Sequence, residues 1–201
     1  MAKNNAKEKL LTSGAEIIYM KGFNNTGLNE ILEAAGVPKG SFYHHFGSKE
    51  DFGLQLIDHF LQKFLADAER YLTATTSSYL QSLQYFFDDF LKFFEANRLK
   101  GGCPIANLTL EMSDINEPMR TRLVEAFDQM NQKVSHFLAK ACDNGELPED
   151  IDVAAVAGFI LNSWEGALLR TKVLKNSSPM ALFNKFIFET LLVHELRPFT
   201  N

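Results

Sequence analysis

The chain has 201 residues, 46% of them hydrophobic, and a formal net charge of −5. Its length allows one medium domain or a small domain joined to a larger one, its apolar content excludes a disordered chain, and its charge excludes nucleic-acid binding through overall basicity. The longest apolar run, 153–161, is far shorter than the ~20 residues of a membrane helix, so we expect no membrane partner. A polar N-terminus without a secretory signal and only two cysteines predict the reducing cytoplasm.

Helix signals run through the whole chain. Six of the twelve glycines fall within residues 22–53, so the first quarter is cut into short helices while the remainder predicts long ones. No segment shows the alternation typical of strands. Apolar periodicity, prolines at helix starts and glycines at helix ends therefore predict an all-α protein. The expected helices span 6–21, 28–35, 39–45, 48–72, 79–95, 104–112, 118–143, 152–175 and 179–196, with Ser48 and Asp152 as caps.

Residues 28–35 and 39–45 form a candidate helix-turn-helix. Gly36 permits the left-handed backbone that such a turn requires. The second helix is too short to be stable alone, so we expect Phe42 and Phe46, four residues apart, to anchor it in the core. The side chains that then project outward suit contacts with base edges and phosphates, and they are Lys39, Ser41, Tyr43, His44 and His45. Tyr43 could instead be half-buried, and the adjacent histidines lack a third ligand, so no metal site is expected.

The stretch 31–46, ILEAAGVPKGSFYHHF, together with Gly22-Phe23, Thr26 and 48–50, resembles the TetR family of bacterial transcriptional repressors (TetR/AcrR type). The resemblance covers residues 6–65. It implies an N-terminal three-helix DNA-binding domain with a helix-turn-helix over 1–65 and a C-terminal helical ligand-binding and dimerisation domain over 66–201. It also implies a homodimer that places two recognition helices in successive major grooves of a palindromic, double-stranded operator.

The family pattern also assigns DNA contacts. It places Ser41, Tyr43 and His44 on DNA and His45 and Lys49 on phosphates. Near the DNA backbone at the start of the helix over 28–35 it places Gly27, Leu28 and Asn29. Gly27 stands where the family often has Ser or Thr, so this chain lacks one hydroxyl there. The distribution of charge agrees in sign with DNA binding by the N-terminal part of the chain. Residues 1–50 carry six Lys against five Glu, a net charge of +1, whereas the remainder carries 14 basic and 20 acidic residues, a net charge of −6.

Aromatic and methionine side chains are the candidates for an effector site in the second domain, because they adapt to apolar ligands. Phenylalanine is abundant, with 18 residues, and several cluster within 86–94. The candidate wall residues are Phe90, Phe93, Phe94, Met112, Phe127, Met130 and Trp164. The alternative for most of them is an ordinary core.

Cys103 lies between two glycines and Pro104, at the predicted start of a helix. The helix dipole and free N–H groups at that position stabilise a thiolate. The surrounding segment resembles a TetR subgroup, some members of which sense electrophiles or oxidants through a cysteine, and Lys172 falls where such sensors carry a lysine that could stabilise the thiolate. The effector is therefore expected to be a small apolar or electrophilic molecule. The alternative is an unreactive buried cap, and Cys142 is expected to serve packing.

By the same resemblance, the last two helices form the dimer interface. Their candidate contacts recur at helical spacing and are Phe183, Phe186, Ile187, Thr190 and Leu191. One chain's own core could also absorb these side chains.

The sequence shows no Ser-His-Asp set, metal-ligand spacing or phosphate-binding glycine loop, so no catalytic residues and no cofactor are predicted. Glu111, Asp114 and Glu165 could form an acid cluster, but a solvated face or a cap is the simpler explanation. An all-α enzyme and a protein-interaction module without DNA binding are the alternatives. The favoured hypothesis is a repressor released from DNA by a small effector or by modification of Cys103.

Overall fold

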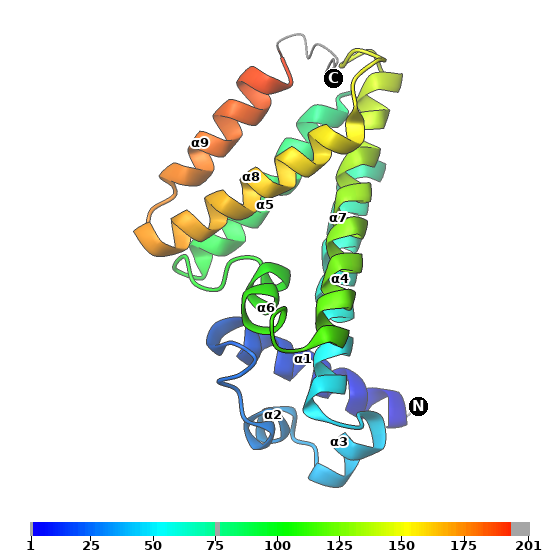
Figure 1. Ribbon diagram of the computed structural model, residues 1–201, viewed down its shortest axis with the longest axis vertical. Coiled ribbons are helices and arrows are strands. Elements are labelled where there is room, and N and C mark those ends of the chain that lie inside the picture. The colour runs from blue at the N-terminus through cyan, green and yellow to red at the C-terminus, as the bar shows by residue number, and fades with distance from the viewer. Residues whose placement is uncertain (1, 75–76, 194–201) are drawn as a thin grey trace. The chain divides into compact units, whose positions relative to one another are not determined.

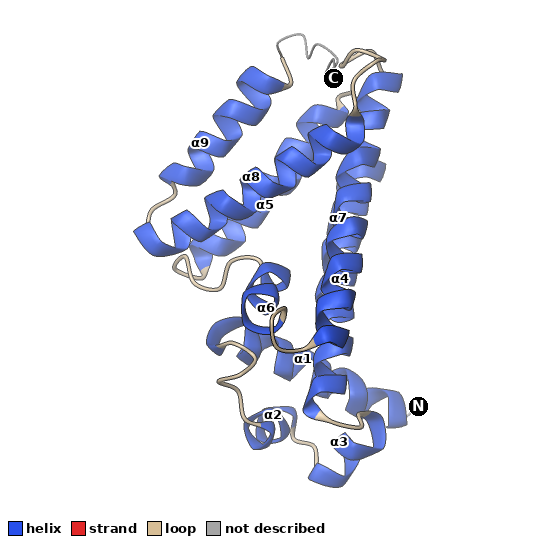
Figure 2. Cartoon of the chain, in the orientation of Figure 1, coloured by secondary structure: helices blue, strands red, loops and turns tan. Residues whose placement is uncertain are grey.

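The structure, a computed structural model, describes residues 2–74 and 77–193, and every regular element within these ranges is helical (Figures 1 and 2). The all-α prediction is confirmed. The helices are α1 (Ala2–Lys21), α2 (Leu28–Ala35), α3 (Lys39–His45), α4 (Lys49–Ala74), α5 (Tyr79–Ala96), α6 (Pro104–Met112), α7 (Glu117–Asp143), α8 (Val153–Leu174) and α9 (Ser178–Phe186), followed by a π-helical turn, η1 (Ile187–Leu191). No described helix is both long enough and apolar enough to cross a membrane.

The chain packs as two compact units. The N-terminal unit comprises Met1–Lys63 and Pro104–Phe127, and the C-terminal unit comprises Phe64–Cys103 and Asp128–Asn201. In this grouping α6 and the start of α7 belong with the first unit, and the functional division into 1–65 and 66–201 stays a prediction. Glu111 on α6 binds the backbone of residues 23 and 24, and Arg122 on α7 pairs with Asp58 on α4.

Two of the predicted helix caps are present. Ser48 Oγ accepts the N–H of Asp51 at 3.1 Å, and the Asp51 carboxylate accepts the N–H of Gly47 at 2.8 Å. Asp152 Oδ1 accepts the N–H groups of Ala154 and Ala155 at 3.1 and 3.0 Å. These bonds satisfy backbone donors that the first turn of a helix leaves unpaired, so they fix where α4 and α8 begin.

The last helix differs from the prediction of one helix over 179–196. The regular part ends at Phe186, and the chain continues as the π-helical turn, in which the Leu192 N–H donates to the Ile187 carbonyl at 3.0 Å. Residues 194–196 lie outside the described residues. This wider turn rotates the side chains that follow it away from the regular helical pattern that the prediction assumed.

Candidate DNA-binding helix and effector-domain site

The turn between α2 and α3 is closed by backbone hydrogen bonds. Gly36 has φ +62°, and its N–H donates to the Glu33 carbonyl at 3.1 Å. The Val37 N–H donates to the Leu32 carbonyl at 3.1 Å, which completes a Schellman motif. The left-handed residue predicted at Gly36 is confirmed, and it sets the direction in which α3 leaves α2.

Two phenylalanines hold α3 against the core of the N-terminal unit. Phe42 and Phe46 are buried, with ring centroids 5.0 Å apart. Phe52 on α4 completes the cluster, 5.7 Å from Phe42 and 5.0 Å from Phe46. The predicted inward orientation of Phe42 and Phe46 is confirmed. This packing stabilises a seven-residue helix that would not form alone.

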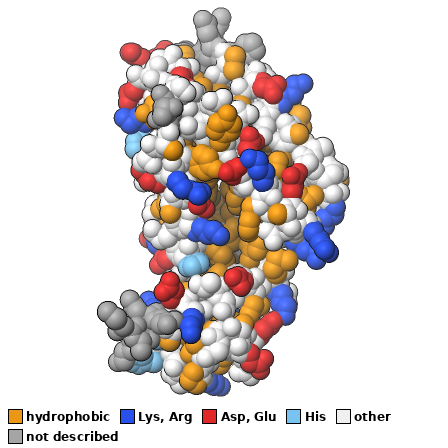
Figure 3. Space-filling view, turned by 180° about the vertical axis from the view of Figure 1, so that it is seen from behind, with side chains coloured by type: hydrophobic (Ala, Val, Ile, Leu, Met, Phe, Trp, Pro, Cys, Tyr) orange, Lys and Arg blue, Asp and Glu red, His pale blue; other side chains and the backbone are white. Residues whose placement is uncertain are grey.

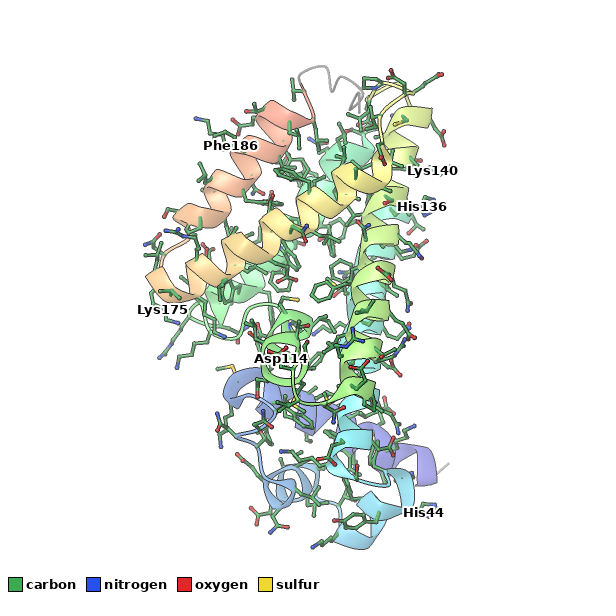
Figure 4. The ribbon with its side chains drawn as sticks, viewed as in Figure 1. His44, Asp114, His136, Lys140, Lys175 and Phe186 are labelled. Atoms are coloured by element: carbon green, nitrogen blue, oxygen red, sulfur yellow. The ribbon has the colours of Figure 1, made fainter. Side chains whose placement is uncertain are left out.

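The opposite face of α3 carries the predicted DNA contacts. Lys39, Tyr43 and His44 are exposed, and Ser41 and His45 are partly exposed. The Lys39 ammonium lies 6.0 Å from the centroid of the Tyr43 ring, so a cation and an aromatic hydroxyl share this face. Figure 4 shows His44 on α3 as well. The individual roles of these residues on DNA stay predictions.

The start of α2 lacks a side-chain cap. Gly27 occupies the N-cap position without a side-chain hydrogen bond, and Gly27 and Asn29 are exposed while Leu28 is partly exposed. The unpaired N–H groups of such a first turn attract anions, which agrees with the predicted place of this segment near the DNA backbone.

Lys49 is engaged within its own unit. Its ammonium donates to the Phe23 carbonyl at 2.7 Å and lies 4.6 Å from the centroid of the Phe23 ring. Burial lowers the pKa of Lys49, while the charges of Glu50 and Glu111 act in the opposite direction. The predicted phosphate contact would have to share this ammonium with the carbonyl, and it stays a prediction. On the face seen in Figure 3, basic and acidic side chains are interspersed.

Trp164 lies at the centre of an aromatic group in the C-terminal unit. Its buried ring is 4.9 Å from Phe90, 5.5 Å from Phe87 and 6.3 Å from Phe64, measured between centroids. Phe90 also lies 6.5 Å from the ring of Phe93, so Phe90 links two other predicted wall residues, Trp164 and Phe93.

The other predicted wall residues are dispersed. Phe94 and Met130 are buried in the C-terminal unit, and Phe93 there is about half exposed. Met112 and Phe127 belong to the N-terminal unit, so the structure does not group them with Trp164. The effector role of each residue stays a prediction.

Buried polar atoms without a hydrogen-bond partner gather in the C-terminal unit. Among the described residues they are Asn131 Oδ1, Trp164 Nε1, Glu165 Oε1, Thr171 Oγ1 and Asn184 Oδ1. Buried polar groups are normally paired, so these atoms provide unused donors and acceptors in the interior.

Cys103 is buried, with 5% of its surface exposed, and its side chain hydrogen-bonds to Glu165 on α8. Burial raises the pKa of Glu165 to about 7, and the Cys103 hydrogen bond acts in the opposite direction. Lys172 lies in the last turn of α8, two helical turns beyond Glu165 and on a similar face.

The three acids that could have formed a cluster are separated. Glu111 binds backbone N–H groups in the N-terminal unit, Glu165 meets Cys103 in the other, and Asp114 is exposed. Glu165 is neither on a solvated face nor a cap: it is partly buried, and its side chain meets the thiol of Cys103. One signal could have found it: Glu165 is the only charged residue between Asp152 and Arg170. No group of three or more metal-binding side chains occurs in the described part of the chain.

Cys142 differs from Cys103 in its surroundings. It is partly exposed, and its Sγ donates to the Pro148 carbonyl at 3.4 Å. Burial and the nearby Asp143 carboxylate raise the pKa of its thiol. Both effects disfavour thiolate, as expected of a packing cysteine.

The α8 and α9 helices pack against each other and leave apolar side chains in solvent. Phe186, labelled on α9 in Figure 4, and Thr190 are exposed, and Leu191 is partly exposed. Phe183 and Ile187 are buried in the single chain, as the alternative of an ordinary core expects, and the interface role of all five residues stays a prediction. Further exposed apolar side chains on α8 and α9 are Phe159, Leu169, Val173 and Leu182, and Val193 is exposed just after η1.

Residues 10–56 match the family described as "Bacterial regulatory proteins, tetR family", and residues 80–187 match the "Tetracyclin repressor-like, C-terminal domain". The chain is 31% identical over 196 residues to the "HTH-type transcriptional repressor DhaR" of Mycobacterium sp. (strain GP1), covering 96% of this chain and 95% of that protein. It is similar to the crystal structure of a regulatory protein TetR from Rhodobacter sphaeroides, with a TM-score of 0.84, 31% identity and coverage of 92% and 97%. The reduced form of E. coli NemR gives a TM-score of 0.84, 27% identity and coverage of 92% and 95%.

Proposed function

The chain belongs to the TetR family of transcriptional regulators, and we propose that it is a cytoplasmic repressor that binds a palindromic operator as a homodimer. The observation that carries this proposal is the division of α3 into two faces. Phe42 is fixed in the core, and Lys39, Tyr43 and His44 are presented to solvent. A short helix held in this way can enter a major groove without rearranging.

Two exposed tyrosines provide a matched test of DNA binding. Tyr43 on α3 is 53% exposed and Tyr85 on α5 is 51% exposed. We expect Tyr43→Ala to weaken binding to operator DNA about 10-fold at fixed salt, the scale of one lost base contact. Tyr85→Ala should leave the affinity unchanged. Binding would be measured on the intergenic DNA upstream of the protein's own gene and on flanking genomic fragments. Equal affinity of the two variants would contradict the assignment of α3 as the recognition helix.

The exposed apolar side chains of α8, α9 and η1 support a dimer interface on these elements. Phe186 is 57% exposed in the single chain, and Phe93 on α5, at 48%, is its matched control. A charge at a buried interface position is strongly unfavourable. Phe186→Lys should therefore shift the protein toward monomer in sedimentation velocity, and Phe93→Lys should not. A dimer that survives Phe186→Lys would place the interface elsewhere.

Release from DNA is proposed to follow binding of a small apolar or electrophilic effector in the C-terminal unit. The aromatic group around Trp164 and the unpaired buried polar atoms of the same unit support this, because ligand sites combine apolar walls with a few polar groups. The effector must bind the DNA-free state more tightly. Cys103→Ser separates two routes: it should abolish release by an electrophile while leaving release by a non-covalent ligand intact.

A further inference from the structure

The backbone of Phe23 connects a carboxylate on α6 to an ammonium group on α4. The Phe23 N–H donates to Glu111 Oε1 at 3.1 Å, and the Phe23 carbonyl accepts a hydrogen bond from the Lys49 ammonium at 2.7 Å. The same carbonyl accepts the Thr26 N–H at 3.3 Å, which closes the turn. An acidic and a basic side chain therefore bind the N–H and the carbonyl of one residue, within the N-terminal unit.

The turn before α2 is built to receive the Glu111 carboxylate. Its two oxygen atoms accept successive N–H groups, that of Phe23 and that of Asn24 at 3.0 Å. Gly22, which precedes them, has φ +89°, and a Cβ atom added to it would lie 2.7 Å from Glu111 Oε1. Successive N–H groups at a left-handed turn form a concave site for anions. Glycine at this position therefore serves both the backbone conformation and the close approach of the carboxylate.

Phe23 also fixes the place of the Lys49 side chain. The ring of Phe23 is buried, and a Cβ atom added to Gly53 on α4 would lie 2.9 Å from it, so the ring packs closely against α4. The Lys49 ammonium lies 4.6 Å from the centroid of this ring. Burial lowers the pKa of Lys49, and the charges of Glu50 and Glu111 raise it. Glu111 thus acts on the ammonium through its charge as well as through the backbone of Phe23.

The Lys49 ammonium is placed to bind a second partner. An ammonium group has three N–H donors, and the Phe23 carbonyl occupies one of them. Lys49 is partly exposed and is the first residue of α4, where the backbone N–H groups of a helix attract anions. A lysine side chain loses conformational entropy when it is fixed on a phosphate. Here the side chain is already ordered before DNA binds.

We propose that Glu111 is a positioning residue for operator binding: it holds the Phe23 turn, and through it the Lys49 ammonium, in the place from which Lys49 contacts a DNA phosphate. Glu111 belongs to the stretch 80–187 that matches the C-terminal family domain, although it packs in the N-terminal unit. Phosphate binding therefore depends on where α6 places this carboxylate. The inference rests on the proposed function, because it concerns the predicted phosphate contact of Lys49.

A measurement without DNA tests the link between Glu111 and Lys49. The lysines of the full-length protein would be acetylated with limiting acetic anhydride at about pH 8, below the ordinary lysine pKa, and followed by peptide mass spectrometry. In Glu111→Gln we expect Lys49 to react about 5-fold faster than in wild type, because the lost hydrogen bonds and the lost charge both make its amine more available. Lys9, exposed on α1, is the internal reference. Asp114→Asn, which removes an exposed acid beyond α6, is the matched control and should leave Lys49 unchanged.

Operator binding tests the role of this link on DNA. At fixed salt we expect Lys49→Met to weaken binding about 10-fold and Glu111→Gln about 5-fold. The double variant should bind no more weakly than Lys49→Met, since Glu111 acts through Lys49, whereas independent effects would multiply to about 50-fold. The slope of log affinity against log salt should become shallower by about 0.9 per subunit in Lys49→Met, and by part of that in Glu111→Gln.

A merely structural role of Glu111 gives different results. Unchanged acetylation of Lys49, multiplying effects of the two substitutions, or an unchanged salt slope in Glu111→Gln would each overturn the proposal. If Glu111→Gln does not fold, as circular dichroism would show, Glu111→Asp replaces it, because it keeps the charge on a shorter side chain; wild-type values for that variant would overturn the proposal. If the wild-type protein binds no specific DNA, the proposed function fails together with the role of Glu111 on DNA, and the acetylation result alone decides whether Glu111 holds Lys49.

Discussion

Glu111 joins α6 to the turn that precedes the helix-turn-helix, and removing its carboxylate should loosen that turn. Its Oε1 accepts the N–H of Phe23 at 3.1 Å and its Oε2 accepts the N–H of Asn24 at 3.0 Å. A hydrogen bond to a charged group contributes about 1.5–3 kcal/mol, and the bond to Asn24 is exposed and weaker. We therefore expect Glu111→Ala to cost roughly 3 kcal/mol in the N-terminal unit.

Hydrogen exchange measures this loss where it occurs. About 3 kcal/mol corresponds to a loss of amide protection at Phe23 of roughly 100-fold, with a smaller loss at Asn24. Trp164 lies in the C-terminal unit, so its fluorescence reports mainly on the other part of the molecule. Asp114→Ala, which removes an exposed acid two residues beyond the end of α6, is the matched control and should change neither amide. Unchanged protection of Phe23 in Glu111→Ala would refute the assigned hydrogen bonds.

Three further variants test the packing and charge of the chain. Gly36→Ala forces a left-handed backbone on alanine and should lower the free energy of unfolding, measured by urea denaturation, by about 1–2 kcal/mol. Gly40→Ala in α3 is the control and should leave the stability unchanged or raise it slightly. Equal effects of the two substitutions would contradict the Schellman turn. A Cβ on Gly14 would lie 2.5 Å from Phe52 Cζ, so Gly14→Ala should cost about 1–3 kcal/mol, and an unaltered denaturation midpoint would argue against that close packing. Burial raises the pKa of Glu165 from 4.5 to about 7, so the folded chain holds this proton more tightly than the unfolded chain, and the free energy of unfolding falls as the pH rises through that range. The stability of Glu165→Gln relative to wild type should therefore increase between pH 4.5 and 7 and be constant below pH 4.5. A stability difference that does not change with pH would refute the pKa shift.

The features that were predicted correctly from the sequence depend on interactions between residues that are close together in the chain. The helix-turn-helix depends on a glycine that adopts φ +62° and on two phenylalanines four residues apart, and all three act within a dozen residues. The caps at Ser48 and Asp152 likewise bind N–H groups two or three residues away. Such interactions can be inferred from spacing alone, because the backbone fixes the partners.

Long-range partners could not be inferred in the same way. Glu111 binds the backbone 88 residues earlier, and Glu165 meets a thiol 62 residues earlier, so sequence spacing gives no hint of either contact. The end of the last helix was missed for another reason. The regular helix ends at Phe186 and the chain continues as a π-helical turn, which a uniform helical period does not anticipate. Phe183 and Ile187 are four residues apart and share the face that is buried in the chain, whereas Phe186 is exposed.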